Sequence, residues 1–213
     1  RGDLEEEGRE GYHHHKLIPE ATPSLTPEEL ASDPREAVLE ALRADVNLLS
    51  GNWQRSPAEE FLKRADPDRI EEEVSNLLYG SGDLDERVRR FLEWGSKREI
   101  EDGKTAGFDG TAASYLLALS DPKEYAFCKT RLAYRPAVKA LLGEEEVRSE
   151  WPERIAHARD FYQATLEVFQ EEHEDLPFFD LMHVHIAFYL AENEDEEQPW
   201  GLCPDNCVTE LAG

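Results

Sequence analysis

The sequence predicts an all-α fold, and three observations lead to this prediction. Apolar residues recur at spacings of three and four along most of the chain, as they do on one side of an α-helix. Four such segments begin at a helix-capping residue, and in three of them a proline follows this residue directly. No window shows the period-two alternation or the β-branched runs typical of strands. We therefore expect one all-α domain over residues 28–193, between an extended acidic arm at 1–27 and a C-terminal segment without regular structure at 194–213.

The N-terminal half contains four expected helices in succession. They are expected to begin at Pro34, Ser56, Pro67 and Leu84 and to end near Gly51, Leu62, Gly80 and Trp94, respectively. Asp33 and Asp66 stand at N-cap positions directly before proline, which suits the first helical turn. Asp83 caps the fourth helix, with Glu86 three residues later in the capping-box position.

Residues 104–143 predict a helix, a tight glycine turn, a second helix, a basic turn and a third helix. Gly107 and Gly110 flank the two-residue turn, and the small residues after it allow a neighbouring helix to approach closely. Further on, Trp151 and Pro152 begin a long amphipathic helix, whose apolar stripe is Ile155, Ala158, Tyr162, Leu166 and Phe169. After an interruption at Pro177, residues 178–190 predict an almost wholly apolar helix at the centre of the core.

Charge is distributed unevenly along the 213 residues. The whole chain carries a formal net charge of −25, but residues 87–139 contain eleven Lys and Arg against seven Asp and Glu. Solubility alone gives no reason to keep positive charge in one block, whereas contacts with nucleic-acid phosphates do. The acidic remainder resembles the surfaces of proteins from high-salt cells, so the acidic runs are interpreted as solvated faces and loops.

Cysteine usage and hydropathy indicate a cytoplasmic protein without membrane segments. Cys128, Cys203 and Cys207 are too few for a closed disulfide framework. No apolar run approaches the length that a membrane span needs, and the N-terminus has no signal-peptide pattern, so the sequence resembles a soluble fragment of a longer chain.

No metal or other cofactor is expected. The adjacent histidines at positions 13–15 point in different directions, and Cys203 and Cys207 lack a matching pair nearby. His183 and His185 are two residues apart, which places them on nearly opposite faces of a helix, one packed and one partly exposed.

The glycine turn resembles the helix-hairpin-helix element, in which amides at a helix N-terminus face a DNA phosphate. Free N–H groups and the positive end of the helix dipole make such a terminus an anion site. Asp109 departs from the pattern because it replaces the usual second glycine and repels a phosphate unless its side chain caps a local amide. An ordinary interhelical turn is the alternative. The DNA-binding residues expected from this region are Lys104, Thr105, Gly107, Gly110, Thr111, Lys129, Thr130, Arg131 and Arg135.

The arrangement also resembles helix-hairpin-helix base-excision glycosylases, but the catalytic groups of that family are missing. Lys129 stands near the position of the catalytic Asp, and Thr111 stands where bifunctional members carry a Lys. Without that carboxylate and amine, neither oxocarbenium stabilisation nor a Schiff base is available. Phosphate-loop, dinucleotide, zinc-protease and serine-hydrolase motifs are absent from the sequence, and Cys128 has no histidine near it in sequence. We expect no catalytic residues and no enzymatic activity in this chain.

The order of several segments resembles a helical module of bacterial restriction and defence proteins, often found ahead of McrB-type motor domains. The segments are NLLYGSGDLDERVRRFL, the glycine turn, YAFCKTRLAYRPAVKALLG, FYQATLEVFQ and LPFFDLMHVHIAFYLAEN. The resemblance covers about two thirds of the chain, roughly residues 66–193. This resemblance implies an accessory or specificity region that engages double-stranded DNA, with a motor or nuclease fused to it or associated with it.

Two functions are therefore expected from the sequence. The first is a non-catalytic module that binds DNA weakly through its basic hairpin region, residues 87–143, within a restriction or defence system. The alternative is a protein-interaction or assembly module, in which the same basic face binds an acidic partner.

Overall fold

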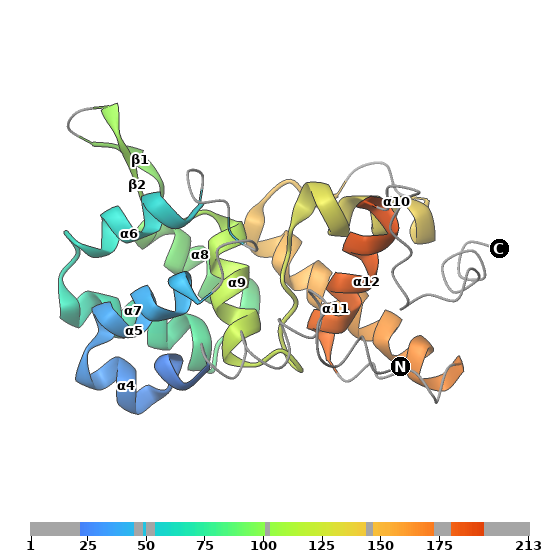
Figure 1. The fold of residues 1–213 in the computed structure, drawn as a ribbon, viewed down its shortest axis with the longest axis horizontal. Helices are drawn as coiled ribbons and strands as arrows, with labels where there is room; N and C mark the ends of the chain where they lie inside the picture. Colours follow the sequence, from blue (N-terminus) through green and yellow to red (C-terminus); the bar gives the residue numbers. More distant parts are fainter. Residues whose placement is uncertain are drawn as a thin grey trace.

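The computed structural model is predominantly helical, as the sequence predicts. It describes residues 22–44, 49, 54–100, 103–143, 147–172 and 180–193. The described α-helices are α4 (Pro27–Ser32), α5 (Pro34–Arg43), α6 (Ser56–Leu62), α7 (Pro67–Tyr79), α8 (Leu84–Gly95), α9 (Gly110–Ser120), α10 (Arg135–Leu142), α11 (Trp151–Glu172) and α12 (Leu181–Asn193). They are joined by a 3-10 helix, η2 (Thr22–Leu25), a π-helical segment, η5 (Thr130–Tyr134), and the antiparallel strands β1 (Arg98–Glu99) and β2 (Thr105–Ala106). Figure 1 shows α4 to α9 towards one end of an elongated molecule and α10 to α12 towards the other.

Local capping chemistry sets most helix starts where the sequence predicts them. The Asp33 carboxylate accepts a hydrogen bond from the Glu36 amide at 3.1 Å, and the Asp66 carboxylate accepts one from the Asp68 amide at 3.0 Å. Each carboxylate satisfies one of the free N–H groups of a first helical turn. Asp83 occupies the N-cap position of α8 but makes no side-chain capping bond.

Other boundaries differ from the sequence-based expectation. Helix α5 ends at Arg43, earlier than the apolar spacing to Leu49 predicts, although Leu49 itself is buried. Residues 1–21 and 194–213, together with Gly51, Pro177 and the start of the predicted apolar helix at 178–179, lie outside the described residues.

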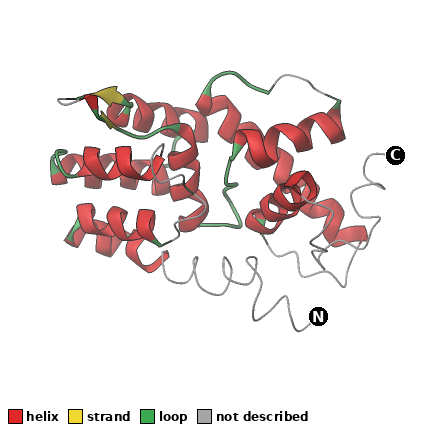
Figure 2. Ribbon diagram, turned by 45° about the horizontal axis from the view of Figure 1, so that its top comes forward, coloured by secondary structure: helices red, strands yellow, loops and turns green. Residues whose placement is uncertain are grey.

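The strands are a correction to the all-helical pattern expected before the glycine turn. Arg98 pairs with Ala106 and Glu99 pairs with Thr105, forming a hairpin between α8 and α9. Figure 2 shows this yellow hairpin as the only sheet among the described elements. Two-residue strands are too short to produce the alternation by which a strand is recognised in sequence.

Helix α9 lies at the centre of the core. Every residue from Gly110 to Leu119 is buried, and α9 contacts η2, α5, α7, α8 and α11. Buried apolar side chains from Leu25 to Phe188 form one continuous cluster around it. The predicted stripe of α11 is buried throughout, and so are Leu181, Met182, Val184, Ile186 and Phe188 of α12.

Candidate functional site

Part of the basic window at residues 87–139 is used in contacts within the fold. Arg87 is buried at 7% exposure, with its guanidinium on the carbonyls at the end of α7. Arg90 forms ion pairs with Glu72 and the buried Glu73, both outside the window in sequence. Arg87 is therefore withdrawn from the surface, and the charge of the exposed Arg90 is balanced by two carboxylates.

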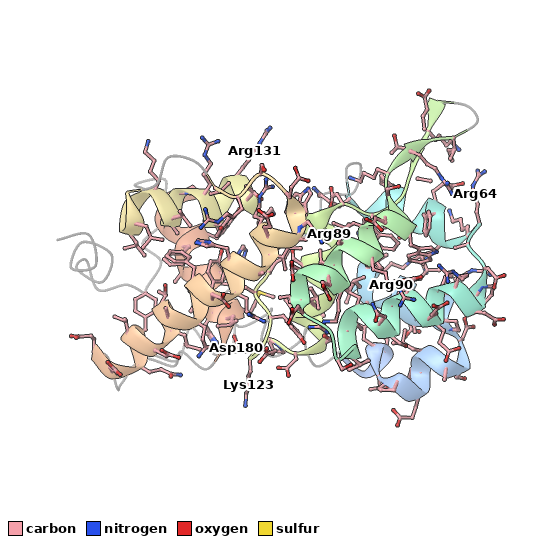
Figure 3. All side chains as sticks on the ribbon, turned by 180° about the vertical axis from the view of Figure 1, so that it is seen from behind. Arg64, Arg89, Arg90, Lys123, Arg131 and Asp180 are labelled. Carbon is pink, nitrogen blue, oxygen red and sulfur yellow. The ribbon has the colours of Figure 1, made fainter. Side chains whose placement is uncertain are left out.

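A second group of cations lies on η5 and α10 and at the residue directly before η5. Residues 129–143 contain four cations and no Asp or Glu. Three of them, Arg131, Arg135 and Lys139, are exposed and four residues apart, so they share one side of the continuous η5–α10 helix. We name these three residues the basic ridge. Figure 3 shows Arg131 directed outward from the body.

The base of the ridge is anchored by a buried tyrosine. Tyr134 is fully buried, and its hydroxyl lies 2.5 Å from Nδ1 of His157 on α11. Its ring packs edge-on against Phe161 of the same helix. The segment η5 is π-helical, a form that is rare and often occurs at functional positions. Its hydrogen bonds enclose one residue more than those of an α-helix, so the helix is wider where the ridge begins. At the other end, Gly143 stops α10 in a left-handed conformation with φ 68°.

Two further predicted residues lie beside the ridge. Lys129 is half-buried, with its ammonium 5.7 Å from the ring centroid of Tyr189 on α12. Thr130 Oγ1 accepts a hydrogen bond of 3.5 Å from Arg154 on α11. Both side chains connect η5 to the two C-terminal helices, so their first role is structural.

Three amides in and after the glycine turn are used in hydrogen bonds within the fold. The Gly107 amide donates to the Pro57 carbonyl at 2.9 Å, and the Phe108 amide donates to the Gly95 carbonyl at 2.6 Å. Asp109 Oδ1 accepts from the Ala112 amide at 3.0 Å, while its Oδ2 lies 2.7 Å from Lys97 Nζ. The carboxylate thus caps a local amide at the start of α9, which is the condition under which Asp109 is expected not to repel a phosphate.

The other predicted residues of the turn are also not part of the ridge. Gly110 and Thr111 are buried, and the Trp151 ring covers Gly110. Lys104 and Thr105 are exposed on the β1–β2 hairpin, which Figure 1 places towards the end of the molecule opposite α10. Of the nine predicted residues, Lys129, Thr130, Arg131 and Arg135 lie together on or directly before the η5–α10 segment. Lys104 and Thr105 belong to the β1–β2 hairpin, and Gly107, Gly110 and Thr111 belong to the turn and the start of α9.

Lys139 completes the ridge but is missing from the residues predicted individually. The signal that identifies it is its spacing of four from Arg135 and eight from Arg131. Spacing alone is insufficient in a chain with so many charged residues, because the sequence does not show which cations lie on an exposed helix side.

Cys128 and Tyr162 are buried polar side chains, and neither is an exposed nucleophile. Cys128 is fully buried, and desolvation raises the pKa of its thiol to about 12, against small opposing effects of Thr130 and Arg154. Burial also raises the pKa of the Tyr162 phenol, with further contributions from Cys128 and Tyr134. At neutral pH both groups are protonated, so neither can act as a nucleophile or base.

The raised pKa of the buried Cys128 thiol predicts a loss of protein stability at alkaline pH. Since the pKa of Cys128 rises from its ordinary value of 9.0 to about 12 on folding, its contribution is fully present below about pH 9 and is lost as pH rises to about 12. The three-unit difference corresponds to about 4 kcal/mol of unfolding free energy. Urea unfolding between pH 8 and 11 measures this slope. Cys128→Ala should flatten it, and equal slopes in parent and variant would contradict the assignment.

The two histidines of α12 have different environments, as the sequence predicts. His185 is buried at 1% exposure, with Nδ1 3.4 Å from the Tyr162 hydroxyl. His183 is partly exposed, and its Nδ1 lies 3.1 Å from Asp180 Oδ1, which also accepts from the amides that begin α12. Among the described residues, no three His, Cys, Asp or Glu side chains converge as metal ligands. His13 to His15, Cys203 and Cys207 lie outside that part of the chain.

Comparison with known proteins gives no further assignment. Within the described ranges, no helix combines the length and apolar character needed to cross a bilayer. No family model matches the chain, and neither the curated proteins nor the solved structures contain a significant match.

Proposed function

We propose that the protein is a non-catalytic module that contacts the phosphate backbone of double-stranded DNA through the basic ridge. The observation that carries this proposal is the acid-free stretch at residues 129–143, which displays Arg131, Arg135 and Lys139 along one exposed side of a helix. Regular spacing of guanidinium and ammonium groups suits a chain of phosphates, which such groups contact without reading base sequence.

The ridge is small, which sets the expected strength of binding. With about three phosphate contacts, the slope of log K against log salt should be near −3. The net charge of −25 repels DNA at long range, but this repulsion is screened beyond about 8 Å at physiological ionic strength. The isolated chain should therefore bind duplex in the micromolar range or more weakly.

Charge reversal of the ridge tests the proposal. Arg131→Glu, Arg135→Glu and Lys139→Glu combined should abolish the salt-dependent anisotropy change of a labelled duplex. The helical circular dichroism should not change, because exposed substitutions contribute little to stability. The matched control, Arg89→Glu, Arg98→Glu and Lys123→Glu, also replaces three exposed cations and alters net charge equally, so it should retain most binding. Equal binding by both triple variants would contradict a specific ridge.

A protein-interaction module is the second candidate, because an exposed apolar side chain ends the same helix. Leu142 is 50% exposed and lies three residues beyond Lys139 on α10. An exposed leucine beside cations suits an acidic protein surface better than a phosphate chain. This candidate replaces the first if the parent chain shows no salt-dependent binding of duplex.

The sequence resemblance supplies the proposed biological setting. An accessory role beside a motor or nuclease of a restriction system agrees with a weak phosphate contact, because a partner domain would add the remaining affinity. This setting stays a prediction from the order of the helical segments.

A further inference from the structure

We propose that Pro136 sets the direction of the basic ridge, because it imposes the π-helical turn that brings the three cations of the ridge into one straight row. The inference rests on the proposed function in treating the ridge as the surface that contacts phosphates. It adds a positioning residue to that surface, since Pro136 acts only through the three cations.

The first supporting observation is a change in the backbone hydrogen bonds within η5. The Arg135 amide donates to the Thr130 carbonyl, five residues earlier. The Tyr134 amide donates to the Lys129 carbonyl, also five residues earlier, at 3.4 Å. The same Lys129 carbonyl accepts a bond of α-helical spacing from the Ala133 amide at 3.2 Å. The change from α-helical to π-helical bonds therefore takes place within this one turn.

The position of Pro136 gives a physical reason for this change. Pro136 is the second residue of α10, directly after the turn, and it has no amide hydrogen. In a continuous α-helix its ring would collide with the carbonyl of Leu132, four residues earlier, and that carbonyl would also lack its usual donor. A wider turn relieves this collision, so a π turn is expected immediately before the proline.

A second example in the same chain supports this cause. Within the described ranges, the other π-helical residues are 54–55, and they precede Pro57, the second residue of α6. Pro57 thus stands in the same relation to a π turn as Pro136 does. The prolines that open α4, α5 and α7, namely Pro27, Pro34 and Pro67, instead follow N-cap residues with non-helical dihedral angles. A π turn therefore accompanies proline where helical residues precede it.

The period of burial along η5 and α10 shows what the turn does to the ridge. Exposed cations occupy positions 131, 135 and 139, and buried pairs occupy 133–134 and 137–138, so the pattern repeats every four residues. Eight residues of a regular α-helix make about 2.2 turns, which would leave Arg131 and Lys139 about 80° apart around the axis. A π turn takes up nearly one residue more, so the same eight residues complete two turns. Arg131 and Lys139 consequently face the same way.

A straight row of cations suits one strand of a duplex. Successive phosphates of a strand lie along one line over the short length of the ridge, which is about 12 Å. A row that turned by about 80° over this length would direct one of its three cations away from the phosphates. The π turn is therefore expected to add one phosphate contact to the two that a regular α-helix would allow.

The variant Pro136→Ala tests the cause of the turn without any DNA. Alanine restores the missing amide, so the amides of Tyr134 and Arg135 should donate to carbonyls four residues earlier, as in an α-helix. NMR couplings across hydrogen bonds identify each donor and acceptor pair in the full chain. The variant should be at least as stable as the parent, because alanine suits a helix far better than proline does. Retention of the π-helical pairs in the variant would overturn the assignment.

Binding of a labelled duplex to the same variant tests the consequence for the ridge. Loss of one phosphate contact should change the slope of log K against log salt from near −3 to about −2, and should weaken binding about tenfold at about 50 mM salt. The matched control is Pro67→Ala, at the exposed first residue of α7, where a missing amide disrupts no helical bond. Its slope should equal that of the parent.

The two measurements separate the positioning role from the proposed function. If the hydrogen bonds of Pro136→Ala change to α-helical spacing but its slope stays equal to that of the parent, the positioning role is overturned. If they change while neither the parent nor the variant binds duplex, the proposed function fails and the assignment of the π turn to Pro136 stands.

Discussion

Replacing Gly110 by alanine is expected to lower the free energy of unfolding by about 3 kcal/mol, the upper part of the range for overpacked cores. A Cβ at this position would overlap Cγ, Cδ2 and Cε3 of Trp151. The obstacle is a rigid indole, half-buried at the start of α11, that lies against the buried Gly110, so the Trp151 ring must be displaced or α9 and α11 must move apart. The melting temperature should fall by roughly 6–12 °C for a protein of this size.

Two comparisons separate this overlap from a general effect of removing glycine. Gly82→Ala places its Cβ 3.9 Å from the nearest atoms and should change stability little. Helix propensity alone favours alanine over glycine at Gly110, so it works against the expected loss. Trp151→Leu combined with Gly110→Ala should cost less than the sum of the two single changes. An additive double variant would show that Trp151 is not the obstacle.

Arg87→Met is expected to cost on the order of 3 kcal/mol, because it removes charge-assisted hydrogen bonds from a buried site. The Arg87 guanidinium donates to the Leu77 carbonyl at 2.9 Å, the Leu78 carbonyl at 3.3 Å and the Tyr125 hydroxyl at 3.0 Å. The two carbonyls belong to the last turn of α7, which has no intrahelical donors for them. Methionine fills a similar volume but leaves these acceptors without their donor.

Arg89→Met is the matched control on the same helix. Its side chain is 51% exposed and pairs with Asp85 at 3.7 Å, so its replacement should change stability by less than about 1 kcal/mol. Chemical unfolding of both variants measures the difference. Similar losses for Arg87 and Arg89 would mean that α8 depends on its overall charge rather than on the buried guanidinium.

The fold could be predicted largely because its signals are local. Asp33 and Asp66 cap helices through amides two or three residues away, and the stripe of α11 follows from helical spacing alone. The β1–β2 hairpin was missed because each strand has only two residues. The early end of α5 is also unpredictable from apolar spacing, since Leu49 is buried without continuing the helix described through Arg43.

The candidate site was only partly predictable because charge neutralisation depends on residues that are distant in sequence. Arg90 pairs with Glu73, seventeen positions earlier, so a count within the window overstates the surface charge. Similarly, the amides of the glycine turn were expected to be free, whereas Gly107 donates to Pro57 from another part of the chain. The basic block itself was visible in the sequence, but only the packing shows which of its cations are buried or paired and which share one helix side.

The central position of α9 has a consequence for the order in which the ribosome delivers this chain. Helices α4 to α8 precede α9 and supply partners for one part of its surface as soon as it emerges. Its contact with α11 cannot begin until about thirty more residues have been synthesised, from Ser120 to the start of α11 at Trp151. During that interval the nascent protein carries an apolar helix with one side uncovered, the kind of surface that chaperones bind and that self-associates when it is not shielded.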